Sequence, residues 1–342
     1  MEAIILAGGF GTRLRPLTYT RAKSLLPILN KPMVYYLIST LPKEVEKVIL
    51  AVNYKKDQIE KYFKNNDFGK EIIVNDEPKP LGTGGAVKFA EKHITGSFFV
   101  LNSDTICSLN LNEMIGFHKK NQAFCTISLW PVNNVSEFGV VDIKEDGNVV
   151  RFVEKPKPED APSNLINAGA YFLKPEVLDY IQTGRLVSME KEIFPRIIED
   201  TGKFYGYEFK GYWIDVGRIQ SYIDVNKILM KNKNMPSFKG NDSNIGGVLT
   251  DSCIGNNVFI GDNSNIKSTV VFDNSHVGIN VKLNNCVIGE NCKIGDYSRL
   301  NNTVVGDNET VSEKSVYDNN IIWNQPIPDG YPKKQIGNVI GE

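Results

Sequence analysis

The sequence predicts two domains in series, an α/β domain with a mostly parallel, doubly wound sheet and then a parallel β-helix. From the N-terminus to about residue 130, short apolar runs alternate with helical patterns, which is typical of a parallel sheet covered by helices on both faces. Beyond residue 245 an apolar residue recurs about every six positions, the hexapeptide period of a β-helix. We therefore expect domains at 1–231 and 245–320, a polar linker at 232–244 and a C-terminal extension at 321–342.

The predicted parallel strands are apolar runs bounded by turn or cap residues, and they span residues 3–6, 47–53, 71–75, 97–104 and 123–130. The helical patterns between them span residues 33–41, 58–63, 85–92 and 112–119. Pro32 precedes the first of these helices, and Asp57 is the expected N-cap of the second. Ligands of such sheets lie beyond the carboxyl ends of the strands, so the loops after these runs form the candidate site.

The alternation then breaks at an apparent hairpin, in which FGVVDI and VVRFVEK flank a turn at residues 145–147. A strand at 170–173, helices at 175–181 and 190–199, the WIDVG segment and a helix from Arg218 to about Met230 complete the first domain.

The β-helix is predicted from two interleaved sets of residues. Large apolar residues recur at steps of six, six and five: Ile254, Ile260, Ile266, Val271, Val277, Leu283, Ile288, Ile294, Leu300, Val305 and Val311. Smaller residues stand two positions before the anchors: Val258, Ser264, Thr269, Ser275, Val281, Cys286, Cys292, Ser298 and Thr303. One large and one small residue per face would fill a narrow core that stacked coils bury, so packing explains Cys286 and Cys292.

Bulk composition narrows the possible partners. A formal net charge of −1 over 342 residues provides no field that favours nucleic acid or anionic membrane. We find no signal-like segment and no apolar run near the about 20 residues of a membrane span, and therefore expect a cytoplasmic protein. The five cysteines lack C-x-x-C spacing, so neither a disulfide framework nor a zinc site is indicated. Three histidines leave little material for histidine-based catalysis.

The first apolar run is followed by three glycines and two cations: Gly8, Gly9, Gly11, Arg13 and Lys23. Glycine reaches φ > 0 and has no Cβ, so such a loop can present backbone N–H groups to a polyanion while the cations neutralise phosphate charge. The glycines alone would favour a tight strand-to-helix turn that happens to be glycine-rich. No Gly-Lys-Ser/Thr completes a P-loop, and Leu14 stands where a dinucleotide fingerprint has its third glycine.

The order G-G-x-G-T-R-L-x-P-L-T, followed by a lysine and Pro27, resembles the signature of the sugar-1-phosphate nucleotidyltransferases, also called NDP-sugar pyrophosphorylases. Ala22 stands where that family usually has proline. The resemblance implies a Rossmann-like catalytic domain and a left-handed β-helix. It also implies nucleotide contacts from one stretch: Leu6, Ala7, Gly8, Gly9, Gly11, Thr12, Arg13 and Lys23. Arg13 and Lys23 would hold the β- and γ-phosphates.

Two carboxylates match the metal ligands of that family. Asp104 follows the apolar run FFVL, where it could hold Mg²⁺ together with phosphate oxygens, or could equally be a turn or helix-capping aspartate. Asp215, in GYWIDVG, matches the second ligand, although it could also be a turn residue ahead of Gly217. Ser103 replaces the glycine of the family's N-G-D string.

Three short strings resemble the sugar-phosphate site of the family. In FVEKP, Glu154 would accept hydrogen bonds from sugar hydroxyls and Lys155 would contact the sugar's phosphate, although a Glu-Lys pair at a strand end is usually solvated surface. Asn167 and Gly169, in NAGAY, match the next sugar-binding string. Gly139, in EFGVV, would present its backbone to the sugar.

The segment EPKPLGTGGA resembles the family's base-binding segment, with Gly82 and Thr83 along the nucleotide and Glu77 at the base-reading position. A carboxylate only accepts hydrogen bonds, so it suits guanine, which offers adjacent N1–H and N2–H₂ donors. Glu77 therefore favours GTP. SMEKEIFP, residues 188–195, also resembles the mannose-1-phosphate guanylyltransferase branch of the family.

The favoured hypothesis is Mg²⁺-dependent nucleotidyl transfer from GTP to mannose 1-phosphate, with Arg13, Lys23, Lys155, Asp104 and Asp215 as the catalytic set. The same chemistry with UTP or dTTP and glucose 1-phosphate stays open, as does a non-catalytic subunit that binds an NDP-sugar. An acyltransferase site in the β-helix is a minor alternative, because His276 is the only histidine there. We expect a homo-oligomer with contacts from the β-helix or the tail.

Overall fold

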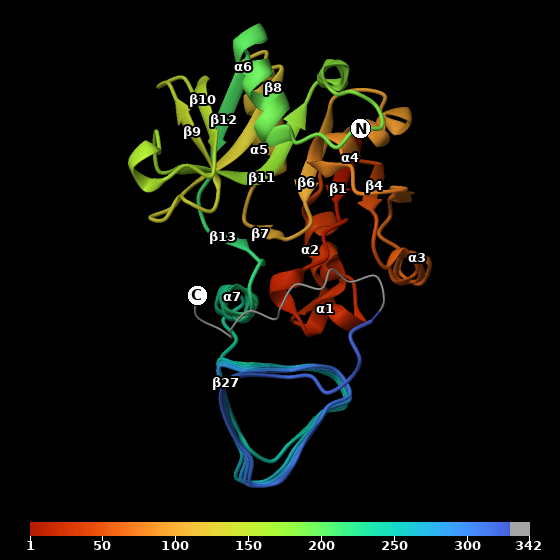
Figure 1. Cartoon of the computed structure of the whole chain (residues 1–342), viewed down its shortest axis with the longest axis vertical. Coiled ribbons are helices and arrows are strands. Elements are labelled where there is room, and N and C mark those ends of the chain that lie inside the picture. Colours follow the sequence, from red (N-terminus) through yellow and green to blue (C-terminus); the bar gives the residue numbers. More distant parts are fainter. Residues whose placement is uncertain (329–342) are drawn as a thin grey trace. The chain divides into compact units, whose positions relative to one another are not determined.

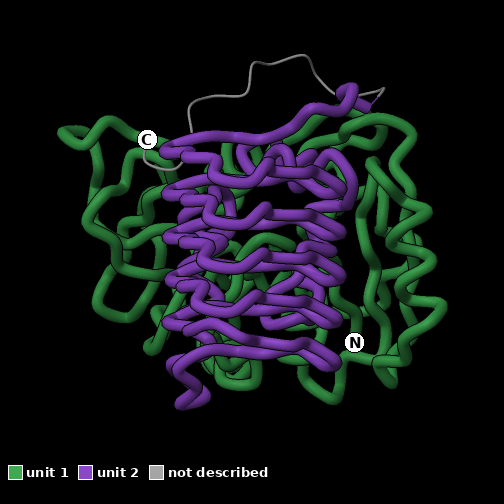
Figure 2. Tube along the Cα trace, turned by 90° about the horizontal axis from the view of Figure 1, so that it is seen from below, with its two compact units in different colours: residues 1–9, 34–213 green, residues 10–33, 214–342 purple. Residues whose placement is uncertain are grey.

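The computed structural model describes residues 1–328, so most of the predicted C-terminal extension lies outside the described residues. The chain forms two compact units. One contains residues 1–9 and 34–213, and the other contains residues 10–33 and the chain from residue 214 onward (Figure 2). The segment that carries Gly11, Arg13 and Lys23 thus belongs to the same unit as the β-helix, which the sequence did not indicate.

The first unit is built on a nine-stranded sheet with the strand order β10-β9-β11-β6-β1-β4-β5, with β8 beside β11 and β12 beside β8 (Figure 1). Its strands are β1 (Glu2–Leu6), β4 (Lys47–Val52), β5 (Glu71–Asp76), β6 (Phe98–Asn102), β8 (Cys125–Pro131), β9 (Gly139–Ile143), β10 (Val149–Glu154), β11 (Leu165–Leu173) and β12 (Phe204–Glu208). Strands β6, β1, β4 and β5 run parallel, which confirms the predicted α/β class, whereas β9, β10 and β11 add antiparallel pairs.

The helices of this unit differ from the predictions mainly at their ends. They are α2 (Met33–Thr40), α3 (Lys56–Lys64), α4 (Gly82–Phe89), α5 (Leu111–Lys120) and α6 (Phe194–Thr201). Asp57 is not the N-cap of α3, because Lys55 holds that position in a left-handed conformation with φ of 51°. Helix α4 begins at Gly82, three residues before the predicted start. The predicted helix 190–199 is a π-helical turn, Met189–Ile193, followed by α6, and the predicted helix 175–181 is a 3₁₀ segment, Pro175–Tyr180.

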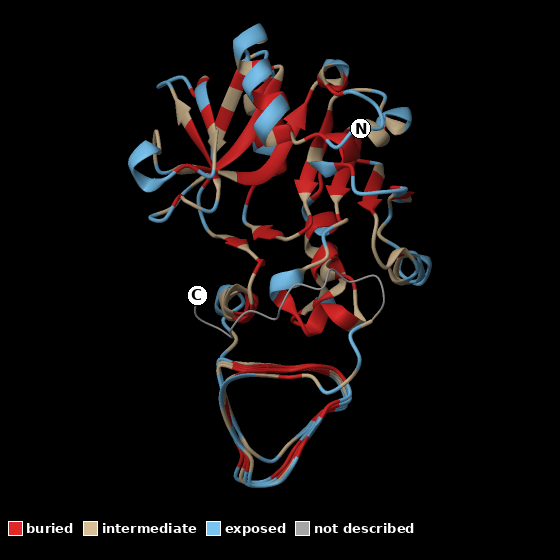
Figure 3. Ribbon diagram, viewed as in Figure 1, coloured by how far each residue is buried: buried red, intermediate tan, exposed pale blue. Residues whose placement is uncertain are grey.

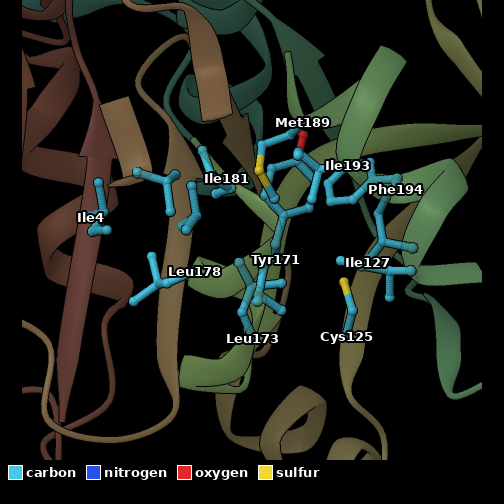
Figure 4. Packing of buried hydrophobic residues seen from close by; sticks show 14 of the residues in the cluster. Ile4, Cys125, Ile127, Tyr171, Leu173, Leu178, Ile181, Met189, Ile193 and Phe194 are labelled. Carbon is cyan, nitrogen blue, oxygen red and sulfur yellow. The ribbon is translucent and has the colours of Figure 1, made fainter. Parts of the chain in front are cut away.

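The core of the first unit lies between the sheet and its helices, where the strand interiors are buried (Figure 3). Ile4, Ile127, Tyr171 and Leu173 come from the strands, and Phe194 of α6 belongs to the same buried cluster (Figure 4). The ring centroids of Tyr171 and Phe194 are 5.0 Å apart.

The second unit joins α1 (Leu17–Thr20), the short strands β2 (Pro27–Ile28) and β3 (Lys31–Pro32), and α7 (Ile219–Asn232) to the β-helix. Two further short strands are β7 (Thr105–Cys107) in the first unit and β13 (Trp213–Asp215), where the chain passes from one unit to the other. The β-helix strands are β14 (Phe238–Lys239), β15 (Asn244–Ile245), β16 (Val248–Thr250), β17 (Cys253–Ile254), β18 (Phe259–Ile260), β19 (Asn265–Lys267), β20 (Val270–Val271), β21 (His276–Val277), β22 (Lys282–Asn284), β23 (Val287–Ile288), β24 (Lys293–Ile294), β25 (Arg299–Val305), β26 (Thr310–Val311) and β27 (Val316–Ile322).

Both residue sets predicted to fill the β-helix are buried. The first coil begins earlier than expected, because β14 pairs with β17 and β15 with β18, inside the stretch 232–244 predicted to be a linker. The corners are turned by residues with positive φ: Asp251, Asn257, Asn263, Ser268, Asn274, Asn280, Asn285, Asn291, Tyr297, Asn302, Asn308, Lys314 and Asn319. Asparagine tolerates the left-handed region better than most residues, which explains the asparagine-rich repeat. The architecture is consistent with a left-handed β-helix.

Candidate active site

The carboxyl ends of the parallel strands bring four predicted loops together. Leu6 lies beside Ala51 of β4 and beside Asn102 of β6, and Val52 lies beside Asp76 of β5. The ladder continues into the loops, since the N–H groups of Ala7, Glu77 and Ser103 donate to carbonyls of β4, β4 and β1 at 2.9, 2.8 and 3.3 Å. The loops after β1, β4, β5 and β6 therefore share one edge of the sheet, where such sheets bind ligands.

Gly8 packs against a residue that the sequence did not single out. A Cβ on Gly8 would lie 3.3 Å from Cγ, Nδ2 and Oδ1 of Asn53, so the glycine accommodates the flat face of that amide, whereas a Cβ on Gly9 would meet nothing within 4 Å. The Oδ1 atom of Asn53 is buried and accepts no hydrogen bond within residues 1–328. The position of Asn53 directly after β4 is the signal that could have found it.

Glu77 is buried, with 7% of its surface exposed. Its Oε2 accepts a hydrogen bond from the Leu81 N–H at 3.2 Å, which closes the loop between β5 and α4. Burial raises the pKa of the Glu77 carboxyl, against the opposing effect of the Leu81 hydrogen bond. The side chain thus has a local structural role, and one carboxylate oxygen bonds no described residue.

The start of α4 is held against residues 185–190. Gly82 has φ of 74°, and a Cβ there would lie 2.5 Å from the Val187 carbonyl oxygen, so both its conformation and its packing require glycine. The Thr83 hydroxyl donates to Glu190 Oε2 at 2.7 Å and accepts from the Met189 N–H at 2.9 Å. Glu190, which lies in SMEKEIFP, thus bonds a predicted nucleotide-binding residue, and the sequence predicted no role for it.

Glu154 ends strand β10 beside Gly139, and Lys155 follows it. A Cβ on Gly139 would lie 2.4 Å from the Phe152 ring and 2.9 Å from Glu154 Oε2. Burial and then the negative charge of Glu190 raise the pKa of Glu154, while Lys155 opposes the shift. The Lys155 side chain is 62% exposed, and its Nζ lies 3.8 Å from Glu154 Oε1. The Lys155 backbone has φ of 50°.

Asn167 and Gly169 lie on β11, close to the end of β6. The Asn167 Oδ1 accepts the Gly169 N–H at 3.0 Å, and its Nδ2 donates to the Tyr171 hydroxyl at 2.8 Å. Gly169 has φ of 81°, and a Cβ there would lie 2.9 Å from Asn102 Nδ2 and 3.0 Å from Thr105 Oγ1. Asp104 lies between those two residues, half-buried in the turn after β6.

The second unit contains the other predicted phosphate-binding residues. Gly11 has φ of 61°, and a Cβ there would lie 2.8 Å from Thr18 Cγ2 and 3.3 Å from Lys23 Cβ. The Thr18 hydroxyl donates to the Gly11 carbonyl at 2.9 Å, which ties the glycine to α1. Thr12 begins the 3₁₀ turn Thr12–Leu14.

Arg13 and Asp215 lie against the same glycine. A Cβ on Gly217 would lie 2.9 Å from Arg13 Nη2 and 3.1 Å from Asp215 Oδ2. Gly217 therefore leaves room for a guanidinium and a carboxylate on one side of its backbone.

Comparison with known proteins decides the family. Residues 2–232 match the family described as Nucleotidyl transferase, and residues 240–335 match the GMPPB C-terminal domain. The chain belongs to the nucleotidyl transferase family. A probable mannose-1-phosphate guanylyltransferase 2 of Arabidopsis thaliana is 42% identical over 77% of this chain and 76% of that protein. The mannose-1-phosphate guanyltransferase of Saccharomyces cerevisiae is 39% identical over 73% of this chain and 72% of that enzyme.

Further matches cover a smaller share of this chain than these two do. The mannose-1-phosphate guanylyltransferase catalytic subunit beta of Xenopus tropicalis is 42% identical over 65% of this chain, which spans 63% of that subunit. The crystal structure of HddC from Yersinia pseudotuberculosis superposes with a TM-score of 0.57 at 31% identity, over 67% of this chain and 99% of that one. HddC has also been solved in complex with GMP-PN.

Nucleotidyl transferases of this family generally use a divalent metal, and the donor set of this chain suits a hard cation. Within residues 1–328, no group of three or more His, Cys, Asp or Glu side chains could hold a metal. A cation bound by one or two carboxylates and the phosphates of a substrate needs no such group. Asp104 belongs to the first unit and Asp215 to the second. Their joint role as metal ligands therefore remains a prediction.

Proposed function

We propose that this protein is a mannose-1-phosphate guanylyltransferase, which converts GTP and mannose 1-phosphate into GDP-mannose and pyrophosphate. The observation that carries the proposal is the buried carboxylate of Glu77, which follows β5 at the carboxyl edge of the sheet, the edge at which Gly8 and Gly9 of the family signature follow β1. The activities named for the Arabidopsis and yeast relatives support the same substrates.

In the proposed reaction, a phosphate oxygen of mannose 1-phosphate forms a bond to the α-phosphorus of GTP. The bond from that phosphorus to the oxygen bridging to the β-phosphate breaks, and pyrophosphate leaves. The attacking oxygen is already anionic near neutral pH, so no histidine base is needed. The protein's contribution is then positioning and charge neutralisation.

The proposed roles follow the chemistry of each side chain. Arg13 and Lys23 neutralise the leaving pyrophosphate, and the exposed Lys155 ammonium receives the phosphate of mannose 1-phosphate. Glu154, Asn167 and the backbone at Gly139 and Gly169 contact the sugar. Leu6 to Gly9, Gly11, Thr12, Gly82 and Thr83 contact the nucleotide.

We propose Mg²⁺ as the metal, held by Asp104 and Asp215. When bound, it would supply electrostatic stabilisation of charge on the phosphates. The two aspartates would hold it through carboxylate oxygens, which are the ligands that Mg²⁺ prefers.

Pyrophosphate release tests the proposal, with GTP, UTP, dTTP, ATP and CTP each crossed with mannose 1-phosphate and glucose 1-phosphate in the presence of Mg²⁺. A preference for GTP with mannose 1-phosphate is expected. A preference for UTP or dTTP would retain the transfer chemistry and remove the role of Glu77 as a guanine reader. Folded protein that releases no pyrophosphate with any pair would indicate the non-catalytic binding alternative.

We further propose that the protein is cytoplasmic and homo-oligomeric. All five cysteines lie within the described residues and are free thiols, as in a reducing compartment. No helix in the described part of the chain is long and apolar enough to cross a membrane.

Light scattering at micromolar concentration tests the proposed homo-oligomer, and a sharp monomer mass would contradict that proposal.

A further inference from the structure

One corner of the β-helix carries an acidic residue in successive coils, 17 positions apart: Asp273, Glu290 and Asp307, here called the acidic corner. Part of this corner holds the coils together, because Asp307 Oδ1 accepts the Glu290 N–H at 2.7 Å and Asp273 Oδ1 accepts the Asn256 N–H at 2.7 Å. Asp307 has a second use. The other carboxylate oxygen of Asp307, Oδ2, faces the segment 10–33, which belongs to the same unit.

Arg21 is the partner of Asp307. The Arg21 Nη2 donates to Asp307 Oδ2 at 2.6 Å and to Glu290 Oε2 at 2.9 Å, and the Thr20 hydroxyl donates to the same Asp307 oxygen at 2.5 Å. The Asp307 and Arg21 side chains are 5% and 17% exposed, so water screens the pair little. The guanidinium also lies over the Phe272 ring, 4.8 Å from its centroid. Removing Arg21 would leave the nearly buried Asp307 carboxylate without its counterion.

Further contacts hold the same segment against the β-helix and against α7. The Tyr19 ring lies 5.1 Å from that of Trp323, and a Cβ on Gly306 would lie 2.4 Å from the Trp323 ring, so the tryptophan is sandwiched between α1 and a coil. The Leu29 N–H donates to Asn226 Oδ1 of α7 at 3.0 Å.

The segment 10–33 contains Arg13 and Lys23, the two cations that the proposed function assigns to phosphate binding. Arg21 is two residues from Lys23, and the Lys23 side chain packs on Gly11. We propose that Asp307, through Arg21 and Thr20, is a positioning residue for nucleotidyl transfer, so that the β-helix fixes the segment from which Arg13 and Lys23 meet the pyrophosphate end of GTP. This inference rests on the proposed function. Small displacements of positioned groups can cost a factor of about 100 in rate.

The test compares Asp307→Asn, Arg21→Met, the double variant and the control Asp296→Asn. Asparagine at 307 keeps an acceptor for the Glu290 N–H and removes the charge that binds Arg21. Asp296 is a matched control, because its Oδ1 accepts the Ile279 N–H at 2.9 Å, the same coil-to-coil bond, and it bonds no residue of the segment 10–33 among those described.

We expect kcat/KM for GTP to fall by about 10- to 100-fold in each single variant. The double variant should be about as active as the less active single variant, since both single variants lose the Arg21–Asp307 ion pair. The control should stay within about twofold of wild type. Hydrogen exchange gives a readout independent of activity. The amides of Leu14, Tyr19 and Leu25, bonded at 2.9 Å to carbonyls within the segment, should exchange faster in Asp307→Asn, while the amides of the coils stay protected.

Wild-type kcat/KM and wild-type exchange in folded Asp307→Asn would overturn the proposal, as would additive losses in the double variant. If Asp307→Asn fails to fold, Arg21→Met decides, because it removes the counterion and leaves the Asp307 carboxylate in place; wild-type kinetics and exchange in that variant would also overturn the proposal. If the wild-type protein transfers nothing, the proposed function fails, while the exchange comparison still tests the anchoring.

Discussion

In the β-helix, buried hydroxyl groups use their hydrogen-bonding capacity on the backbone, whereas at the carboxyl edge of the sheet buried polar groups keep unused oxygens. Ser264 Oγ donates to the Gly278 carbonyl at 2.8 Å and accepts the Val281 N–H at 2.9 Å. Glu77 accepts one hydrogen bond, and Asn53 Oδ1 accepts none within residues 1–328. A satisfied buried group contributes to folding, while one with spare capacity costs stability unless a ligand completes it.

The largest effect is expected at the edge of the sheet. Asp104→Ala should lower kcat for pyrophosphate release by about 10³-fold or more, because the carboxylate is proposed to hold the metal that neutralises phosphate charge. The thermal midpoint should change little, since Asp104 lies half-buried in a turn. Asp179→Ala, which removes an exposed carboxylate, serves as the control. Near-normal turnover of Asp104→Ala would remove Asp104 from the site.

Glu77→Gln tests whether the spare oxygen of Glu77 reads the base. The glutamine oxygen can keep accepting the Leu81 N–H, so folding should be preserved, but an NH₂ donor then replaces the spare oxygen and faces the N–H donors of guanine. We expect kcat/KM for GTP to fall by about 10- to 100-fold and the relative use of UTP to rise. The five-nucleotide assay measures this, with Glu91→Gln as an exposed control. An unchanged nucleotide preference would leave Glu77 with its structural role alone.

The β-helix should respond in the opposite way. Ser264→Ala leaves the Gly278 carbonyl and the Val281 N–H without their bond to Ser264, which should cost about 1–3 kcal/mol of unfolding free energy with no change in kcat. Denaturation by urea, followed by circular dichroism and compared with Asn265→Ala at the exposed neighbouring position, measures the cost. A loss of activity without a loss of stability would break the distinction drawn between the two regions.

The same comparison explains what the sequence could predict. The β-helix repeats one environment every 17 residues, so the anchors and small residues from Ile254 to Val311 could be assigned from spacing alone. The site in the α/β unit occurs once, and no period reveals it. The apolar runs could predict where strands end, and hence that Asp104 follows a strand. The motif resemblance was needed to assign chemistry to Glu154 or Asn167, and the roles of these two residues remain predictions.

What could not be predicted depends on contacts distant in sequence. Thr83 binds Glu190, 107 positions away, and Arg21 binds Asp307, 286 positions away. Neither pair has a local signal, because each partner alone fits an exposed turn or helix. The N-cap of α3 was misjudged for a similar reason: Asp57 has the right chemistry, but the chain turns in through Lys55 in a left-handed conformation.

The smallest expected effect concerns His118 of α5, a buried polar group in the first unit that lies outside the candidate site. Its Nδ1 is 2.8 Å from the Thr126 hydroxyl, its ring packs edge-on against Phe172 at 4.7 Å, and its buried Nε2 has no hydrogen-bond partner in residues 1–328. Burial, followed by the positive charges of Lys174 and Lys119, lowers its pKa from 6.5 to about 4.

Between those two values the unfolded chain binds a proton at His118 that the folded protein does not bind. Stability should therefore fall as the pH drops below about 6.5, by about 1 kcal/mol between pH 7.5 and 5.5. Urea unfolding at both pH values should show this loss in wild type and in His276→Gln, which removes an exposed histidine, but not in His118→Gln. Equal pH dependence in wild type and His118→Gln would contradict the assignment. If His118→Gln instead lowered kcat/KM for GTP at pH 7.5, a buried group with an unused hydrogen-bonding atom would contribute to function even outside the carboxyl edge of the sheet.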